Sequence, residues 1–293
     1  MVYGDYTQAE LDRQYDQTSL VPNIAIYTGD WLARSAATRE RIDCGLDQAY
    51  GMHPREKLDV FPASHPAAPA FLIFHGGAWR GLSKNHFSMV AAPLVAAGIT
   101  AVVVGFGLVP TVSLDVQIHQ ARAAVSWVSQ RSAVLSIDPS RIFVAGHSSG
   151  GHIAVLMATT DWTVWQLPAD TVKGAVSVSG IYDMEPVRLS SRNAYLHLSD
   201  QGAHRNSAIA QLDSRTFKPS LVIAWAANEL DEFRRQGRTF ATASQDAGWP
   251  TVALQLEKHN HFSAVEAMTD SDGPIARQMI EMVCRTPSTR RCG

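Results

Sequence analysis

The feature that most constrains the fold is a run of ten residues whose pattern predicts a strand, a tight turn and the start of a helix. Residues 142–151 read IFVAGHSSGG, so an apolar, β-rich run stops where a helix-forming run begins. The junction, residues 146–150, has the pattern G-x-S-x-G. A serine on such a strained turn is held clear of its neighbours, where a base can activate its hydroxyl. The segment therefore predicts a buried strand that is followed by a tight turn and a helix, with Ser148 on the turn as a nucleophile.

Strands and helices alternate along most of the remaining chain. Alternation of this kind is typical of a mostly parallel sheet that is covered by helices on both faces. The 293 residues are enough for a single α/β domain, residues 1–293, with about eight strands. We expect strands at 57–61, 70–75, 99–105, 141–146, 172–179, 220–226 and 251–257, and helices at 86–97, 114–131, 150–159, 232–247 and 274–284.

Two segments fall outside this alternation. Residues 1–55 contain helical patterns and precede the first predicted strand, so we expect a helical segment that can act as a lid. Residues 183–219 are polar and hold no clear strand. A long insertion of this kind is usually functional, and we expect it to be an excursion over the active site.

A second motif supports nucleophilic chemistry. The apolar residues 71–74 lead into His75-Gly76-Gly77, whose unencumbered N–H groups can converge on a developing oxyanion. We expect the oxyanion hole to consist of the N–H groups of Gly76, Gly77 and Ser149, with His75 bracing the loop. His147 and His152 flank the predicted nucleophile but have no required chemical role.

Two histidines compete for the role of base. His259 and His261 follow the last predicted strand, and such an H-x-H pair is also compatible with half of a metal site. The sequence has no H-E-x-x-H motif and no paired acidic cluster, so we expect no metal.

Three acids compete for the role of orienting that base. Glu229, Asp231 and Glu232 all follow the strand predicted at 220–226, and all fit the chain order serine, acid, histidine. Glu229 is favoured because it lies nearest the strand, whereas Asp231 could simply cap the next helix. Asp183, after the preceding strand, is the next alternative.

Composition sets broad limits on the class of protein. A net charge of −2 and 46% hydrophobic residues describe an ordinary globular protein and give no reason to expect nucleic acid as a partner. Residues 87–114 carry no charged side chain, but Pro93 and Gly98 divide them into a helix and a buried strand, so we expect no membrane span. The N-terminus lacks the basic start and apolar centre of a signal peptide.

The cysteines suggest a reducing environment. The chain has three, Cys44, Cys284 and Cys292, without C-x-x-C spacing, so neither a disulfide framework nor a zinc site is indicated. We therefore expect a cytoplasmic protein. The oligomeric state stays open, a homodimer included.

Five short segments stand out together: 75–79 (HGGAW), 146–152 (GHSSGGH), 179–186 (SGIYDMEP), 231–236 (DEFRRQ) and 260–262 (NHF). They resemble those of kynurenine formamidase, also called arylformamidase, and of related esterases of the hormone-sensitive-lipase type, and the resemblance covers almost the whole chain. It implies an α/β-hydrolase fold in which Glu229 is the acid and His261 the base. Ala78 stands where many members have tyrosine, and Glu229 replaces the more usual aspartate.

The resemblance also implies a reaction. We expect a serine hydrolase that cleaves the formamide of an aromatic amine such as N-formylkynurenine, a small molecule, without any cofactor. Candidate substrate contacts are Trp79 and Tyr182 for an aromatic ring, and Arg80, Lys84 or Arg188 for a carboxylate. The alternatives are a carboxylesterase acting on short-chain aryl esters and a non-catalytic ligand receptor built on the same scaffold.

Overall fold

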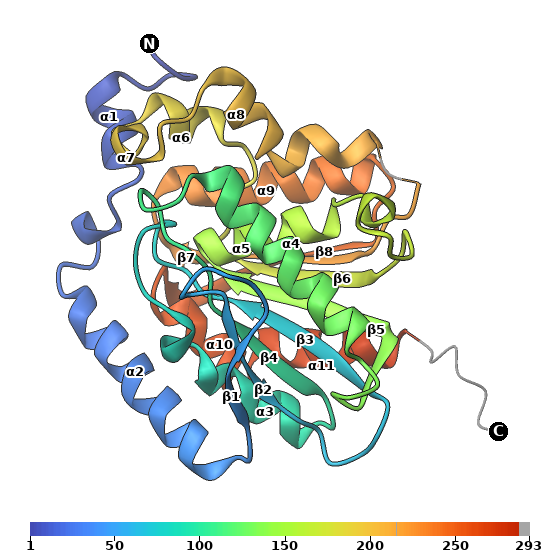
Figure 1. The fold of residues 1–293 in the computed structure, drawn as a ribbon. Coiled ribbons are helices and arrows are strands. Elements are labelled where there is room, and N and C mark those ends of the chain that lie inside the picture. The colour runs from blue at the N-terminus through green and yellow to red at the C-terminus, as the bar shows by residue number, and fades with distance from the viewer. Residues whose placement is uncertain (215, 287–293) are drawn as a thin grey trace.

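One mixed sheet forms the centre of the molecule (Figure 1). The computed structural model describes residues 1–214 and 216–286, and within these ranges eight strands pair in the order β1-β2-β4-β3-β5-β6-β7-β8. β2 is antiparallel to β1 and β4, and the remaining neighbours are parallel, which confirms the predicted sheet. The strands are β1 (Gly45–Ala49), β2 (Lys57–Phe61), β3 (Ala68–Phe74), β4 (Thr100–Val104), β5 (Ile137–His147), β6 (Val172–Val178), β7 (Ser220–Asn228) and β8 (Thr251–Asn260).

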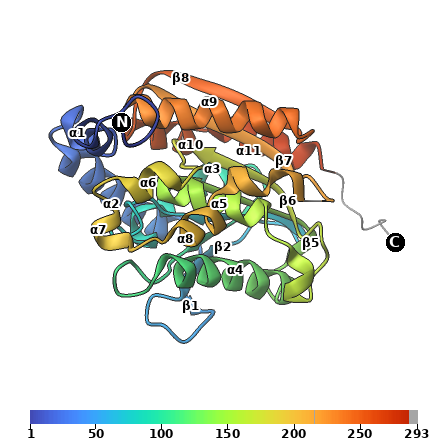
Figure 2. The same ribbon diagram turned by 90° about the horizontal axis from the view of Figure 1, so that it is seen from above.

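Helices cover both faces of this sheet, and β1 and β8 lie at its opposite edges (Figure 2). The α-helices are α1 (Gln8–Arg13), α2 (Ile24–Arg41), α3 (Ala91–Ala96), α4 (Leu114–Gln130), α5 (Ser149–Ala158), α6 (Glu185–Leu189), α7 (Asn193–Leu196), α8 (Asp200–Arg205), α9 (Asp231–Asp246), α10 (Glu266–Thr269) and α11 (Pro274–Cys284). Short 3₁₀ turns are η1 (Gln17–Ser19), η2 (Lys84–His86), η3 (Ser88–Val90), η4 (Trp162–Trp165), η5 (Ala208–Ser214) and η6 (Ser263–Val265).

The alternation of side chains along β3 divides the hydrophobic core in two. Leu72 and Phe74 join one cluster, which also contains the buried faces of α4, α5 and α9. Phe71 and Ile73 point the other way and join a second cluster with α3, α10, α11 and Trp31 of α2. Because all seven residues of β3 are buried, the strand reads as a continuous apolar run, as expected for parallel strands covered on both faces.

Two predicted elements differ from the structure. Residues 45–49 lie within the segment expected to be helical, yet they form β1, a polar edge strand that a sequence pattern does not reveal because only one neighbour pairs with it. The helix predicted at 86–97 is shortened to α3, and the turns η2 and η3 precede it. Pro93 has no N–H to donate, so it fits the first turn of α3 but not the interior of a longer helix.

The N-terminal segment and the excursion meet at one end of the molecule. In Figures 1 and 2, α1 lies beside α6 and α7, and in Figure 1 α2 continues down the left edge. The backbone N–H of Ser191 donates to Oδ1 of Asp12 at 2.6 Å, and Nη2 of Arg192 donates to the carbonyl of Tyr15 at 2.6 Å. These contacts join two segments that are about 180 positions apart in the sequence.

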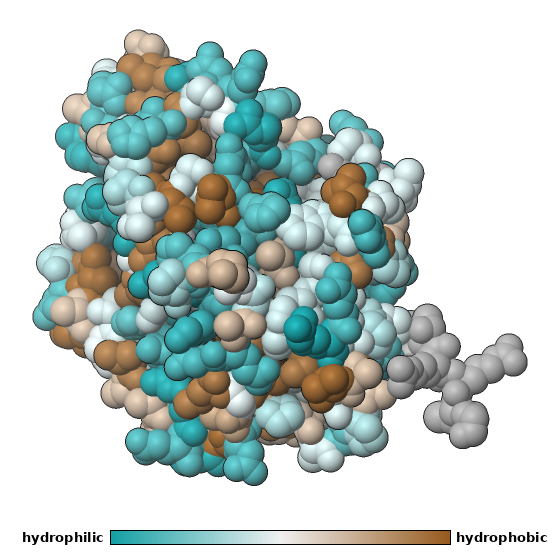
Figure 3. All heavy atoms as spheres, in the orientation of Figure 1, coloured by the Kyte–Doolittle hydropathy of each residue, from teal (hydrophilic) through white to brown (hydrophobic). Residues whose placement is uncertain are grey.

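On the face shown in Figure 3, hydrophobic residues form small groups among polar ones, as is usual for a folded domain. Cys44 and Cys284 are free thiols, while Cys292 lies outside the described residues. Within the described ranges, no helix has the length and apolar character that crossing a membrane requires.

Candidate active site

Ser148 lies on a strained turn between β5 and α5. Its φ of 57° and ψ of −123° are unusual for a residue with a side chain, and its N–H donates to the carbonyl of Val178 at 2.8 Å. Two glycines make the turn possible. A Cβ on Gly146 would lie 2.2 Å from the carbonyl oxygen of Gly150, and one on Gly150 would lie 2.1 Å from that of Phe74.

His261 and Glu229 complete a hydrogen-bonded chain that starts at Ser148. Nε2 of His261 is 3.0 Å from Oγ of Ser148, and its Nδ1 is 2.9 Å from Oε2 of Glu229. The other carboxylate oxygen, Oε1, accepts a hydrogen bond from the N–H of Ala226 at 3.0 Å, which fixes the rotation of the carboxylate. All three side chains are buried, so the chain is shielded from water. This arrangement can move the serine proton to the imidazole while the acid orients the ring.

The competing residues lie elsewhere. Asp231 is exposed and pairs with Arg234, and Glu232 pairs with Arg235, so neither contacts His261. His259 uses Nδ1 in a hydrogen bond with the carbonyl of Ser263 at 2.9 Å. Of the alternatives left open by the sequence, the geometry brings only Glu229 and His261 to Ser148.

Burial opposes a charge on either member of the His261–Glu229 pair. It raises the pKa of the Glu229 carboxyl, and it lowers the pKa of the His261 imidazole, which the positive charge of Arg192 lowers further. A neutral imidazole can accept the serine proton. The resulting imidazolium is then stabilised by the carboxylate beside it rather than by water.

Backbone donors for an oxyanion lie next to Ser148. A Cβ on Gly76 would be 3.3 Å from Cβ of Ser148, and Gly77, with a φ of 118°, lines the same cavity as the serine. Ser149 begins α5, so its N–H has no partner within the helix. In the part of the chain that the structure describes, the N–H groups of Gly76, Gly77 and Ser149 make no backbone hydrogen bond, which leaves them available.

A cavity of about 300 Å³ contains Ser148 and His261. The N-terminal segment supplies much of its wall, because residues of η1 and α2 line it together with Phe262. Trp31 of α2 is almost completely buried and packs edge-on against His147, with ring centroids 6.0 Å apart. Sequence patterns gave no signal for this wall beyond the helical character of residues 1–55.

The predicted substrate contacts are only partly on this cavity. Arg80 lines it, while its role in binding substrate stays a prediction. Trp79 is 1% exposed and donates its indole N–H to Nδ1 of His152 at 3.1 Å. Tyr182 is fully buried and stacks on Phe240 with centroids 4.4 Å apart. Both aromatic rings therefore pack in the hydrophobic core, where large apolar side chains are commonly buried.

The two other basic candidates already have acidic partners. Nζ of Lys84 is 2.7 Å from each carboxylate oxygen of Asp59, which is completely buried. Arg188 pairs with Glu185 and Asp200 on the excursion. Neither residue lines the cavity with Ser148.

The flanking histidines have structural hydrogen bonds. His75 is stacked on Phe106, with centroids 4.2 Å apart, and its Nδ1 contacts the carbonyl of Gly76 at 2.8 Å, so it does brace the loop. Nε2 of His147 contacts the carbonyl of His261 at 2.7 Å. Burial lowers the pKa of both His75 and His147, so they act as neutral rings. Within the described ranges, no group of three or more metal-ligating side chains is found.

Known proteins with similar sequences include a kynurenine formamidase and a carboxylesterase. Residues 58–212 match the BD-FAE family. The kynurenine formamidase of Danio rerio is 32% identical over 243 residues, which span 81% of each chain. The chain belongs to the kynurenine formamidase family. A carboxylesterase of Mycobacterium tuberculosis is 37% identical over 98 residues, 33% of this chain and 31% of its own.

The solved structures agree on the fold. A protein from a Silicibacter species, described as a putative thioesterase, superposes with a TM-score of 0.81 at 24% identity, over 94% of this chain and 99% of that one. The strand order and this likeness identify the α/β-hydrolase fold. The chain is therefore an α/β-hydrolase enzyme rather than a ligand receptor on that scaffold.

Proposed function

We propose that this hydrolase cleaves the formamide of an aromatic amine, with N-formylkynurenine as the expected substrate, through Ser148, His261 and Glu229. The observation that carries the proposal is the continuous hydrogen-bonded chain from Glu229 through His261 to Ser148, which ends in the cavity. The 32% identity to a kynurenine formamidase supports the choice of bond and substrate.

In the first half of the reaction, Oγ of Ser148 attacks the formyl carbon and its proton passes to Nε2 of His261. The carbonyl oxygen becomes an oxyanion, which accepts hydrogen bonds from the N–H groups of Gly76, Gly77 and Ser149. His261 then gives the proton to the amine nitrogen as the C–N bond breaks. The free aromatic amine leaves, and a formyl ester stays on Ser148.

In the second half, water attacks the formyl ester and gives a proton to His261. The bond between the formyl carbon and Oγ of Ser148 breaks, His261 returns the proton to that oxygen, and formate leaves. Glu229 stays ionised while the ring carries its positive charge, and it holds Nδ1 as a donor throughout.

The N-terminal segment fits the role of a lid in this proposal. Tyr15, Gln17 and Trp31 are on the cavity wall and are buried. Excluding water from the site would strengthen the hydrogen bonds to the oxyanion.

We place the enzyme in the cytoplasm because the two described cysteines are free thiols.

A carboxylesterase that acts on aryl esters is the second candidate. The observation that favours it is Ala78, which lines both the cavity with Ser148 and an adjoining groove of about 700 Å³. Where many family members have a tyrosine, this chain has a small side chain, so the site has room for larger aryl groups or for acyl groups larger than formyl.

Rates on matched substrates test the proposal. We expect kcat/KM for N-formylkynurenine to exceed that for its N-acetyl analogue and for phenyl acetate, because a bulkier acyl group moves the carbonyl away from the oxyanion donors. A 1 Å displacement costs on the order of 10²-fold. A preference for the ester or the acetyl compound would favour the second candidate.

Replacing the nucleophile tests the chemistry itself. Ser148→Ala should lower turnover by about 10⁶-fold, the size of the loss on removing such a serine in another hydrolase, and it should abolish labelling by a fluorophosphonate. Ser129→Ala, on the outer part of α4, is the matched control and should leave both unchanged. Normal labelling of the Ser148 variant would disprove the assignment.

A further inference from the structure

Two arginine side chains, Arg80 and Arg192, line the cavity that contains Ser148. Arg192 precedes α7 on the excursion, and Arg80 follows the oxyanion loop. Among the described residues, no carboxylate lies within ion-pair distance of either guanidinium. By contrast, Arg188, four residues before Arg192, pairs with two carboxylates.

Arg192 is held in a fixed position. Its Nη2 donates to the carbonyl of Tyr15 at 2.6 Å, and its guanidinium carbon lies 5.2 Å from the ring centroid of Tyr15 and 5.9 Å from that of Trp79. The two aromatic rings pack around the guanidinium plane without neutralising its charge. Within the part of the chain that the structure describes, the other guanidinium N–H donors of Arg192 make no hydrogen bond, so they can bind a ligand in the cavity.

Arg80 adds a second positive charge to the same wall. Its guanidinium carbon lies 4.3 Å from the ring centroid of Tyr195, and the side chain lines both the cavity and the adjoining groove, as Arg192 does. The two charges repel each other: burial and, to a smaller extent, the charge of Arg80 lower the pKa of Arg192, while the charge of Asp16 raises it. Like charges in a partly buried site are unfavourable unless an anion joins them.

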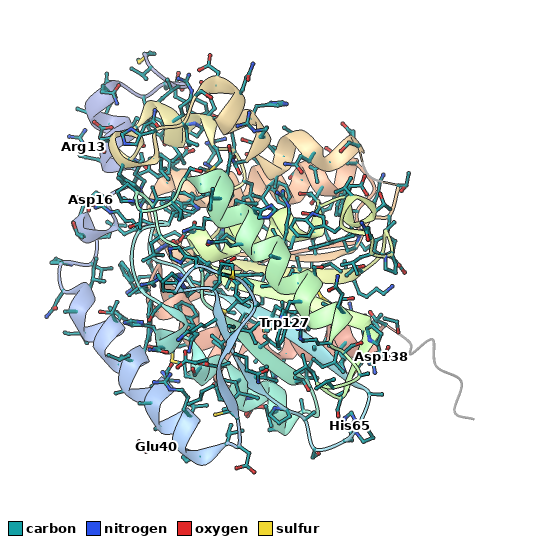
Figure 4. The ribbon with its side chains drawn as sticks, viewed as in Figure 1. Arg13, Asp16, Glu40, His65, Trp127 and Asp138 are labelled. Carbon is teal, nitrogen blue, oxygen red and sulfur yellow. The ribbon has the colours of Figure 1, made fainter. Side chains whose placement is uncertain are left out.

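The acidic side chains of the groove, Asp12 and Asp16, accept hydrogen bonds from backbone N–H groups, and Asp16 also lines the cavity with Ser148. Arg13 and Asp16, labelled in Figure 4, lie where the N-terminal segment passes the excursion. Oδ1 of Asp16 accepts from the N–H of Thr18 at 3.0 Å, and Oδ1 of Asp12 accepts from the N–H of Ser191 at 2.6 Å. Among the described residues, the wall nearest Ser148 therefore presents two guanidinium groups and the Asp16 carboxylate, which lies beyond ion-pair distance of both.

We propose that Arg192, together with Arg80, forms an anion-binding subsite that selects substrates carrying a carboxylate on the leaving amine. Guanidinium forks match the two oxygens of a carboxylate, and such charge-assisted bonds are stronger than neutral ones. Both arginines line the junction between the cavity and the groove, so the carboxylate would bind away from the scissile bond. The inference rests on the proposed function for the acyl carbon at Ser148.

A substrate pair that differs only in the carboxylate tests the subsite. N-formylkynurenine carries a carboxylate and an α-ammonium group, whereas its carboxamide keeps the ammonium, lacks the carboxylate and is nearly the same size. We expect wild-type enzyme to prefer the carboxylate, and Arg192→Gln to lower the ratio of the two kcat/KM values by about 10- to 100-fold, the effect of losing a hydrogen bond to a charged group. The change should come mainly from KM. Arg192→Lys should be intermediate, because it keeps the charge and loses the fork.

Controls separate binding from stability. Arg188→Gln removes a guanidinium that does not line the cavity and should leave the ratio unchanged. If Arg192→Gln melts at a much lower temperature than wild type, Arg80→Gln is the second variant and should lower the ratio in the same direction. A wild-type preference for the carboxamide, or the wild-type ratio in folded Arg192 and Arg80 variants, would overturn the proposal.

A second pair of substrates makes failure of the subsite distinguishable from failure of the proposed function. If wild-type enzyme releases no formate from either formamide, the same ratio is measured with 3-acetoxybenzoate and phenyl acetate. A charge preference lost in the Arg192 variant would then support the subsite in an esterase. Efficient formamide hydrolysis without any charge preference would leave the proposed function standing and refute the subsite.

Discussion

Replacing Glu229 by glutamine tests the contact on which the proposed mechanism depends. The two residues have the same shape, so the change removes the charge and one acceptor while leaving the packing. In the native site, Oε1 accepts from the N–H of Ala226 at 3.0 Å and Oε2 contacts Nδ1 of His261 at 2.9 Å. Glutamine has a single acceptor oxygen, so it can satisfy only one of these two donors.

The geometry determines which donor is lost. If the amide oxygen faces Ala226, its NH₂ group points at Nδ1 of His261 and forces the ring into the tautomer that carries its proton on Nε2. That tautomer cannot accept the proton of Ser148. The opposite orientation leaves the ring correct but places NH₂ against a buried N–H, at a cost of about 1–3 kcal/mol. We therefore expect kcat to fall by up to about 10⁴-fold, the effect of a wrong tautomer in another triad enzyme.

Steady-state hydrolysis of N-formylkynurenine and of phenyl acetate by each variant is the assay, with thermal melting to confirm folding. Asp231→Asn is the matched control, because that carboxylate is exposed and pairs with Arg234 rather than with His261. It should retain nearly full activity. If Asp231→Asn lost more turnover than Glu229→Gln, Asp231 would be the acid, and small effects in both would place the acid elsewhere.

Three further predictions follow from the same geometry. Burial and the charge of Arg192 lower the pKa of His261, so the proposed base should stay neutral as pH falls through 6.5; because burial also raises the pKa of Glu229, the check is the kcat/KM profile of Glu229→Gln, and an acid limb above 6.5 in that variant would contradict a lowered pKa of His261. Ala78→Tyr should narrow the junction to the groove and lower kcat/KM for bulky aryl esters on the order of 10²-fold more than for phenyl acetate. Gly150→Ala would press a methyl group on the carbonyl of Phe74, so its unfolding free energy should fall by about 1–3 kcal/mol. Because the same turn holds Ser148, the turnover of the folded variant should fall as well.

The sequence predicts the sheet well because burial on both faces leaves a clear pattern. β3 and β7 appear as runs of apolar residues, and their predicted and observed bounds differ by two residues or fewer. The edge strand β1 was not predicted, because GLDQA has no alternation, and its pairing with β2 depends on contacts between strands rather than on its own residues.

The proposed nucleophile follows from local sequence, because the turn that holds Ser148 requires glycines at fixed positions. The proposed base does not, because the residues alone left His259 and His261 as alternatives and the resemblance favoured His261. The proposed acid does not follow from local sequence either. Glu229, Asp231 and Glu232 lie within four residues, and what separates them is the direction in which each side chain leaves the end of β7 and the start of α9. Trp79 and Tyr182 were expected to line the pocket, but both are buried in the core. The residue type predicts that an aromatic ring makes contacts, and it does not predict whether those contacts are with a ligand or with the core.

Arg188 and Arg192 show which contacts of a charged side chain the sequence predicts and which only the structure reveals. Arg188 and Arg192 belong to the same excursion, and only the structure shows that Arg192 lines the cavity. Yet the sequence holds part of the difference. Glu185 lies three residues before Arg188, a spacing at which opposite charges meet on a helix, whereas no acidic residue lies three or four positions from Arg192. An arginine without a local partner must find one across the fold or in a ligand, and in this enzyme the described fold offers none within ion-pair distance.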